Sequence, residues 1–319
     1  MKPLRIGTRG SALALWQANH VAAALKRLHG METELVWIRT TGDRFESASP
    51  ASRNDEQIGS EAVTKGMFIK ELEEALLAGT VDLAVHSMKD VPTETPPGLV
   101  LAAMTRREDP RDCLISRHGG TLKTLPDGAR IGTSSLRRQA QLRHHRPDAD
   151  VVDLRGNVDT RLKKLDRGEF DSIVLAMAGL SRLGLADRVT QVLDEDVMLP
   201  AVGQGALGIE TRADDPLTLQ FVSALGDDET RACITAERAL LEALQGGCQV
   251  PLGALGSLRG GELHLEAAVF SAAGSEYIRC SENGPAEQAR PIGLRLAAAL
   301  IESGAEKLLR LAGRTVGQR

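Results

Sequence analysis

The stretch from residue 129 to residue 175, ARIGTSSLRRQAQLRHHRPDADVVDLRGNVDTRLKKLDRGEFDSIVL, decides the fold class of this chain. Short apolar runs with the length of buried strands alternate with longer segments that have a helical pattern, and Pro147 ends the first of these helices. The predicted strands and helices are 129–132, 134–146, 150–154, 158–167 and 172–175. Strands that alternate with helices are typical of an α/β protein with a mainly parallel sheet.

The N-terminal part of the chain has the same rhythm. Its predicted strands and helices are 4–7, 11–28, 34–39, 67–77 and 81–85. Both blocks place Ile-Gly-Thr at the end of a strand, followed by hydroxyl and arginine side chains at the start of a helix, in residues 6–11 and 131–137. The sequence therefore predicts two similar lobes. Residues 42–64 lack any periodicity, and we expect a mobile loop there.

A third region begins at about Asp228 with a long helical pattern over 229–244. It continues into alternating strands at 254–258 and 263–270 and ends in a helical stretch. This order predicts a small α+β domain. A length of 319 residues agrees with two or three domains of about 150 residues or fewer.

The charge of the chain is close to balanced, with 39 Lys and Arg against 43 Asp and Glu. Between Arg130 and Lys164, however, nine Lys and Arg residues face four Asp residues, a local balance of 9 − 4 = +5. RNA binding is one interpretation of this segment. Aromatic residues are only 3% of the chain, so stacking surfaces for bases are scarce, and we expect no nucleic-acid partner.

The N-terminus shows no apolar run of the kind found in signal peptides, and we expect a cytoplasmic protein without a membrane span. The four cysteines are Cys113, Cys233, Cys248 and Cys280, and no two of them form a C-x-x-C pair. We therefore expect reduced thiols and no metal site.

Several arginines stand where predicted strands end, the edge at which open α/β sheets bind ligands. They are Arg9, Arg137, Arg138, Arg155 and Arg161. Serines at the helix starts, namely Ser11, Ser134 and Ser135, add donors near the positive end of each helix dipole. For any one turn the simpler interpretation is a serine N-cap beside solvated arginines. Taken together, the turns predict a polycarboxylate or polyphosphate ligand.

Residues 86–92, HSMKDVP, follow another predicted strand and offer an imidazole, a cation and a carboxylate. Asp90 could stabilise a cationic intermediate while Lys89 binds an anionic group. The alternative is a turn in which Asp90 accepts backbone N–H groups and Lys89 is a surface charge. Spacing alone leaves both interpretations open.

Cys248 lies in GGCQVP, residues 246–251, where the glycines leave it without side-chain cover. Lone cysteines are most often small buried hydrophobes. The Gly-Gly and Pro flanks favour a functional thiol, either a nucleophile or a covalent anchor for a cofactor. A Cys–His hydrolase that pairs Cys248 with His86 or His144 is a further possibility, but no spacing supports a triad.

The order and spacing of six motifs resemble the porphobilinogen deaminase (hydroxymethylbilane synthase) family. These are IGTRGS, HSMKDVPT, GTSSLRRQAQL, LRGNVDTRL, LPAVGQGALGIE and GGCQVPLG, which span residue 6 to about residue 253. The resemblance implies two doubly wound α/β lobes similar to periplasmic binding proteins and a small C-terminal α+β domain. The implied boundaries are 1–105 with 206–223 for lobe 1, 106–205 for lobe 2, and 224–319 for the C-terminal domain.

The resemblance also implies the activity and the groups that perform it. Cys248 would carry a dipyrromethane cofactor through a thioether, and four porphobilinogen molecules would condense on this primer with loss of ammonia. Water would then release hydroxymethylbilane, a precursor in tetrapyrrole and haem biosynthesis. In the family this transferase is a monomer.

The site residues are implied by the same motifs. Asp90 would be catalytic, because a preorganised carboxylate can stabilise positive charge that develops near pyrrole nitrogens. The implied cofactor contacts are Cys248, Ser11, Lys89, Asp90, Thr133, Ser135, Arg137 and Arg138. The implied substrate contacts are Arg9, Arg155, Arg161, Arg182, Lys65 and Gln204. Residues 63–66 read Val-Thr-Lys-Gly where the family usually has Gly-Gly-Lys-Gly.

A protein that binds an anionic solute without turning it over is the main alternative. Two lobes with arginine clusters would suit such a receptor equally well. The lack of a secretory signal and the exposed setting predicted for Cys248 both favour the enzyme.

Overall fold

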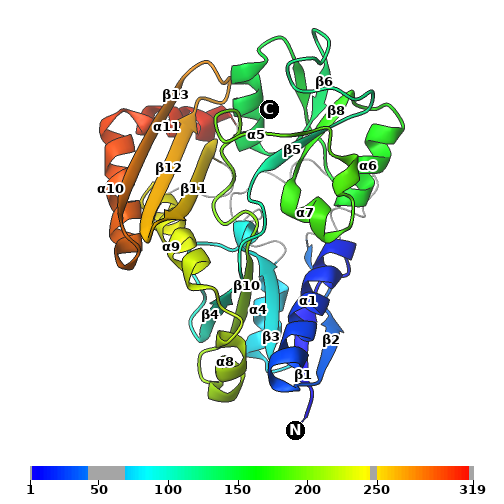
Figure 1. Cartoon of the computed structure of the whole chain (residues 1–319), viewed down its shortest axis with the longest axis vertical. Helices are drawn as coiled ribbons and strands as arrows, with labels where there is room; N and C mark the ends of the chain where they lie inside the picture. Colours follow the sequence, from blue (N-terminus) through cyan, green and yellow to red (C-terminus); the bar gives the residue numbers. More distant parts are fainter. Residues whose placement is uncertain (1, 42–68, 245–249, 316–319) are drawn as a thin grey trace. The chain divides into compact units, whose positions relative to one another are not determined.

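The computed structural model describes residues 2–41, 69–244 and 250–315 of the chain (Figure 1). The predicted loop at 42–64 and the candidate residues Lys65 and Cys248 lie outside the described residues. The chain divides into two compact units, each of which is formed by two separate segments. The first unit comprises Met1–Arg107 and Ala206–Arg231, and the second comprises Glu108–Gly205 and Ala232–Arg319.

The first unit contains a five-stranded sheet in the order β2-β1-β3-β10-β4. Its strands are β1 (Leu4–Thr8), β2 (Thr33–Trp37), β3 (Leu83–Ser87), β4 (Leu99–Met104) and β10 (Leu207–Arg212). β1 is parallel to β2 and β3, whereas β10 is antiparallel to both of its neighbours. Its helices are α1 (Ala12–His29), α4 (Lys70–Leu77) and α8 (Pro216–Ser223), together with the short 3-10 helix η3 (Met88–Asp90).

Helix α1 shows how local sequence sets these elements. It begins after Ser11, whose hydroxyl accepts a hydrogen bond from the backbone N–H of Ala14. It ends at Gly30, which has a left-handed conformation with φ of 63° that glycine adopts without strain. The buried face of α1, including Ala18, Val21 and Leu25, packs against the sheet. The predicted helix 11–28 is confirmed.

The second unit contains a five-stranded sheet in the order β7-β6-β8-β5-β9. Its strands are β5 (Asp112–Ser116), β6 (Arg130–Gly132), β7 (Asp150–Val152), β8 (Ser172–Ala176) and β9 (Gln191–Val192). Its helices are α5 (Leu136–His145), α6 (Val158–Asp166) and α7 (Met177–Arg182), with the short η4 (Ala186–Arg188). β6 is parallel to β7 and β8, and β5 is antiparallel to β8 and β9.

The two five-stranded sheets have the same layout. In each, three parallel strands are followed by one antiparallel strand and an edge strand, and the two Ile-Gly-Thr motifs begin in the equivalent strands β1 and β6. In the sequence, the antiparallel strand of each sheet comes after a strand of the other sheet, since β5 follows β4 and β10 follows β9. The expected pair of doubly wound α/β lobes is confirmed. The antiparallel strands are a feature that the periodicity did not predict.

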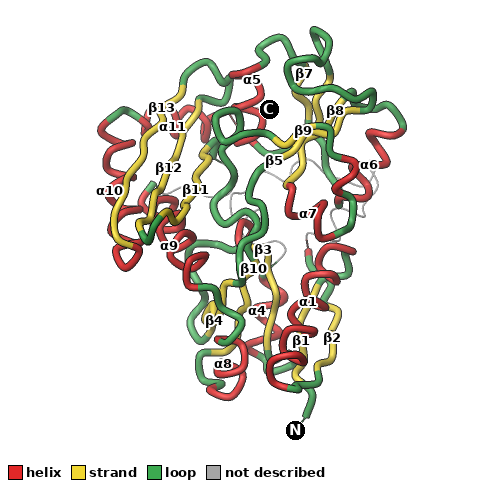
Figure 2. The backbone as a smooth tube through the Cα atoms, in the orientation of Figure 1, coloured by secondary structure: helices red, strands yellow, loops and turns green. Residues whose placement is uncertain are grey.

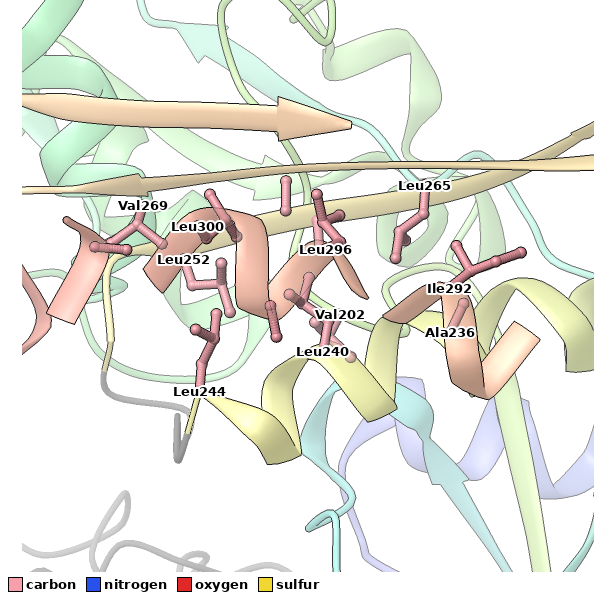
Figure 3. Packing of buried hydrophobic residues seen from close by; sticks show 14 of the residues in the cluster. Val202, Ala236, Leu240, Leu244, Leu252, Leu265, Val269, Ile292, Leu296 and Leu300 are labelled. Atoms are coloured by element: carbon pink, nitrogen blue, oxygen red, sulfur yellow. The ribbon is translucent and has the colours of Figure 1, made fainter. Parts of the chain in front are cut away.

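The second unit also contains a three-stranded antiparallel sheet, β11 (Leu252–Arg259), β12 (Glu262–Phe270) and β13 (Tyr277–Pro285). Figure 2 shows α9 (Asp228–Ala243) and α10 (Ala289–Glu302) alongside these strands, and η5 (Ala286–Gln288) and α11 (Ala305–Thr315) complete the region. Aliphatic side chains from α9, α10 and the sheet form one core (Figure 3). The sequence pattern did not predict β13, because its mostly polar residues lack a clear apolar alternation.

Candidate active site

The turn from β6 into α5 gathers hydroxyl side chains at the start of the helix. Ser135 is the N-cap of α5, and its Oγ accepts from the backbone N–H of Arg138 at 3.5 Å. Thr133 is buried, and its Oγ1 accepts from the Ser135 N–H at 3.3 Å. The Ser134 Oγ is buried and has no hydrogen-bond partner in the described part of the chain. The N-cap interpretation therefore holds for Ser135, while the hydrogen-bonding capacity of the Ser134 hydroxyl is unused within the described residues.

Arg137 and Arg138 of α5 share a buried carboxylate, that of Asp112 in β5. Arg137 Nη1 donates to Asp112 Oδ2 at 2.7 Å, and Arg138 donates to Oδ1 from Nη2 at 2.7 Å and from Nε at 3.1 Å. Asp112 is 0% exposed, and each arginine side chain is less than a tenth exposed. Burial alone would raise the pKa of Asp112, but the attraction and hydrogen bonds of the two guanidinium groups hold it well below its ordinary value.

This cluster retains a net positive charge. Two guanidinium groups face one carboxylate, so one positive charge remains at the start of α5. Burial lowers the pKa of Arg137, and this effect outweighs the opposite influence of Asp112. Within the described residues, the Nε of Arg137 is buried and has no hydrogen-bond partner. A carboxylate of a ligand would satisfy this N–H, and the Ser134 Oγ of the same turn is likewise without a partner in the described residues, so the donor set fits an anionic cofactor.

Asp112 was absent from the candidates that the sequence suggested. The one signal in the sequence was the position of this acid directly before the apolar run of residues 113–115. An acid there is predicted to be buried only when its counter-ion is known, because an unpaired buried charge is costly. Gln204, which the sequence suggested as a substrate contact, also reaches this carboxylate. Its Nε2 donates to Asp112 Oδ1 at 2.9 Å and to the Pro110 carbonyl at 2.7 Å. The contact of Gln204 with substrate stays a prediction.

Three further arginines come after parallel strands of this sheet. β6, β7 and β8 are parallel, so the segments that follow them begin at one edge. Arg155 follows β7, and its side chain is 61% exposed, 3.9 Å from Asp153 Oδ2. Arg161 Nε donates to the Gly156 carbonyl at 2.6 Å and thereby holds the turn into α6. Arg182 of α7 donates to the Gly205 carbonyl at 2.6 Å, and burial lowers its pKa.

In the first unit, the candidate residues also follow parallel strands. Arg9 and Ser11 follow β1, and Lys89 and Asp90 follow β3. Asp90 ends η3 with an exposed side chain, and it accepts no hydrogen bond from the described residues. The alternative in which Asp90 caps a turn through backbone N–H groups therefore finds no support in these residues.

The segment that carries Asp90 is firmly held. The Met88 N–H donates to the Ala206 carbonyl at 3.0 Å, and the Gln17 Nε2 donates to the Ser87 Oγ at 2.9 Å. The loop was expected to begin at His86, but β3 continues through Ser87. A buried contact with β10 extends the strand, since His86 Nε2 lies 2.9 Å from Glu210 Oε2. A rigid base therefore presents the exposed Asp90 carboxylate.

The other thiols and histidines have structural contacts. Cys113 and Cys233 are buried and Cys280 is half-buried, and burial raises the pKa of Cys113 to about 12. His144 Nδ1 lies 3.0 Å from the Gly274 carbonyl. The described part of the chain contains no group of three or more His, Cys, Asp or Glu side chains placed to hold a metal ion. Within the same residues, no helix is both long enough and apolar enough to cross a bilayer.

Comparisons with known proteins match nearly the whole chain. Residues 4–220 match the family model described as "Porphobilinogen deaminase, dipyromethane cofactor binding domain", and residues 231–302 match "Porphobilinogen deaminase, C-terminal domain". A porphobilinogen deaminase of Pelobacter propionicus is 50% identical over 309 residues, with 97% of this chain and 96% of the relative covered. One of Chlorobium phaeobacteroides is 51% identical over 313 residues, with 97% of each covered.

Similar solved structures are much more distant in sequence. A methionine binding protein shows a TM-score of 0.45 at 16% identity, over 72% of this chain and 91% of its own. A periplasmic substrate-binding protein of an ABC transporter from Coxiella burnetii shows 0.42 at 14%, over 70% and 91%. These scores support no assignment of function. The assignment rests instead on the two matched family models and on the identity of about half over nearly the full length. The chain belongs to the porphobilinogen deaminase family.

Proposed function

We propose that this chain is a hydroxymethylbilane synthase that condenses four porphobilinogen molecules head to tail in tetrapyrrole biosynthesis. In each condensation the aminomethyl carbon of one porphobilinogen loses its amine and bonds to a free ring carbon of the next pyrrole. The amine and the proton of that ring carbon leave together as one molecule of ammonia, which balances the step. Hydrolysis then releases hydroxymethylbilane.

The buried cationic cluster at the start of α5 is the observation that carries this proposal. It lies within residues 4–220, which match the cofactor-binding domain of the family. Porphobilinogen carries an acetate and a propionate group, so a growing chain of pyrroles accumulates carboxylates. The partnerless Nε of Arg137 and the net positive charge beside Asp112 provide a fixed, desolvated binding position for one of them.

Dipyrromethane, when bound, supplies the first pyrrole to which substrate is added. We place its attachment at the thiol of Cys248, through a thioether, as the GGCQVP motif implies. The Arg137 and Arg138 guanidinium groups would hold its carboxylates, and Ser135 and Thr133 keep the start of α5 in place. In the first unit, the hydroxyl of Ser11 would hold the start of α1 in place as Ser135 holds that of α5. Lys89 provides a further cation for the cofactor there.

Asp90 is the catalytic residue in this proposal. Loss of the amine and attack by the next pyrrole place positive charge near a ring nitrogen, and a fixed carboxylate lowers the free energy of that state. Asp90 is exposed, while its segment is anchored through Ser87 and Met88. The carboxylate therefore requires little reorganisation when charge develops.

The remaining assignments follow the family motifs. We assign substrate contacts to Arg9, Arg155, Arg161, Arg182, Lys65 and Gln204. We also propose a three-domain division at the boundaries given above, a monomeric state and a cytoplasmic location. The distribution of cations over several strand ends supports these contacts, because a chain of pyrroles requires a carboxylate site for each ring.

An intact-mass measurement tests the attachment and the function together. Purified wild-type protein is compared with Cys248→Ser and with Cys280→Ser, a matched change at a half-buried thiol. We expect an adduct of dipyrromethane size on the peptide that contains residues 246–251 in the wild type and in Cys280→Ser, and none in Cys248→Ser. Ammonia release from porphobilinogen should follow the same order. Saturable binding of porphobilinogen without an adduct or ammonia would instead identify a non-enzymatic anion binder.

A further inference from the structure

Gln141, on the face of α5 next to Arg137, holds the backbone of Leu199 from both sides. Its Oε1 accepts from the Leu199 N–H at 2.8 Å, and its Nε2 donates to the Leu199 carbonyl at 3.1 Å. Gln141 is only 2% exposed, and Leu199 is fully buried. A buried amide that satisfies both polar groups of one residue fixes that residue in position and orientation.

The Leu199 carbonyl also connects to the cationic cluster. It accepts a second hydrogen bond, at 2.6 Å, from Arg137 Nη1, the same atom that donates to Asp112. The position of Leu199 and the orientation of the Arg137 guanidinium group are therefore coupled. A shift of the Leu199 backbone would change the direction in which the partnerless Arg137 Nε points.

The segment that contains Leu199 and Pro200 packs against β11 on its other side. The Ala254 N–H donates to the Pro200 carbonyl at 2.9 Å. Gly253 has no room for a side chain, because a Cβ there would lie 2.6 Å from the Leu199 Cβ and 2.7 Å from its carbonyl oxygen. A small apolar cluster of Ala140, Leu199, Leu255, Ala268 and Phe270 joins α5 to β11 and β12 across Leu199.

Residues further along α5 strengthen this connection at the turn between β12 and β13. Arg143 Nη1 donates to the Ala272 carbonyl at 2.8 Å, and His144 Nδ1 lies 3.0 Å from the Gly274 carbonyl. One helix thus binds Asp112 through its first residues and the three-stranded sheet through its later ones. Gln141 lies between these two groups of contacts.

We propose that Gln141 is a positioning residue, which fixes strand β11 to the helix that carries Arg137 and Arg138. This inference rests on the proposed attachment at Cys248, because β11 is the first strand after that residue. A group that is bonded to the chain at one point and held through its carboxylates at another requires a fixed distance between the two points. Gln141 Nε2 donates to the Arg137 backbone carbonyl at 3.3 Å, and Gln141 acts on the Arg137 guanidinium group and on β11 through Leu199.

The test replaces Gln141 by methionine, which keeps the length of the side chain and removes both hydrogen-bonding groups. Gln191→Met is the matched control, because Gln191 Oε1 also holds a backbone N–H, that of Leu122, at 2.7 Å within the same unit. The readouts on purified full-length protein are hydrogen exchange of the Ala254 amide, the fraction with an adduct on Cys248, and kcat and KM for porphobilinogen.

In Gln141→Met we expect Ala254 to exchange about tenfold faster, as the loss of one or two buried hydrogen bonds implies. The adduct-bearing fraction and kcat should fall, while KM changes by less than about twofold because the substitution leaves the proposed substrate cations in place. Gln191→Met should match the wild type in all of these readouts. If Gln141 had a purely structural role, Gln141→Met and Gln191→Met would both lower the thermal stability. The two variants would then have the same Ala254 exchange rate and the same adduct-bearing fraction.

Exchange of Ala254 and an adduct fraction equal to those of the wild type would overturn the proposal. Should Gln141→Met fail to fold, Gln141→Glu, which can still accept from the Leu199 N–H but cannot donate to the Leu199 carbonyl, tests the same contact, and unchanged exchange and loading there would overturn the proposal equally. A wild-type protein without any adduct on Cys248 would refute the proposed function, whereas the exchange of Ala254 would still decide the connection through Gln141.

Discussion

Replacing Asp112 by asparagine removes the only carboxylate that accepts from Arg137 and Arg138 among the described residues, with little change in shape. The structure gives this carboxylate four hydrogen bonds, three from the two guanidinium groups and one from Gln204. The variant leaves two positive groups buried side by side, and an asparagine Nδ2 cannot accept from Arg137 Nη1. We expect Asp112→Asn to lower the free energy of unfolding strongly.

The magnitude follows from the burial of all three partners. Breaking a buried ion pair by removing one charge costs about 3–5 kcal/mol, because the remaining charge stays desolvated. This is a large part of the stability of an ordinary domain, which is about 5–15 kcal/mol. Each kcal/mol lowers the Tm of a domain of this size by about 2–4 °C, so we expect a decrease of about 6–20 °C.

Urea unfolding followed by circular dichroism measures this difference at pH 7. Asp148→Asn is the matched control, because Asp148 forms an equally short ion pair with Arg146 at the surface, at 2.7 Å. Surface pairs are screened by solvent, so the control should lose far less stability. A loss in Asp112→Asn no greater than in Asp148→Asn would refute the reasoning that the buried cluster requires its counter-ion.

The pH dependence of the same two proteins provides a second check. The folded protein holds the pKa of Asp112 below its ordinary value of 3.8. Its contribution to stability is therefore complete above pH 3.8 and is lost as the pH falls through the lower pKa of the folded state. The stability difference between wild type and Asp112→Asn should stay constant from pH 7 to about pH 5 and narrow only below 3.8.

Three further substitutions test other parts of the site. Asp90→Asn should fold like the wild type, because the side chain is exposed, and lose about a hundredfold or more in kcat; wild-type rates of ammonia release would exclude Asp90 from catalysis. Arg155→Leu should keep its Tm, since the side chain is 61% exposed, but stall chain growth, which mass spectrometry would show as accumulated intermediates; an unchanged pattern would contradict the role. Glu210→Gln weakens the buried contact with His86 and should cost about 1–3 kcal/mol in urea unfolding, so an unchanged midpoint would count against that contact.

The sequence predicted the elements whose residues interact with near neighbours. The helix that begins after Ser11 and ends at Gly30 has its start and stop signals within the segment itself. Likewise, the strand β8 centres on the short apolar run Ile-Val-Leu, which needs no distant partner to be recognised. The polar strand β13 was missed because it is stabilised by pairing with β12, which its own composition does not reveal.

The candidate site divides in a similar way. The motifs identified Arg137, Arg138 and Gln204 as side chains of interest, and they placed Asp90 on a turn after a strand. They did not show that one carboxylate, Asp112, lies between the first three. A strong contact between residues 25 or 92 positions apart leaves no periodic trace in a single sequence.

By itself, the sequence determined the α/β class, the repeated Ile-Gly-Thr turn and the set of residues that resemble a known family. The tertiary structure decided which of those residues are exposed and which are bound to one another. It placed the antiparallel strands β5 and β10 within the two sheets, buried the arginine pair around Asp112, and joined Leu199 to Gln141 across 58 positions. The physical reason is that helix and strand patterns arise from neighbouring residues, whereas desolvation, ion pairing and backbone clamps depend on segments that only folding brings together.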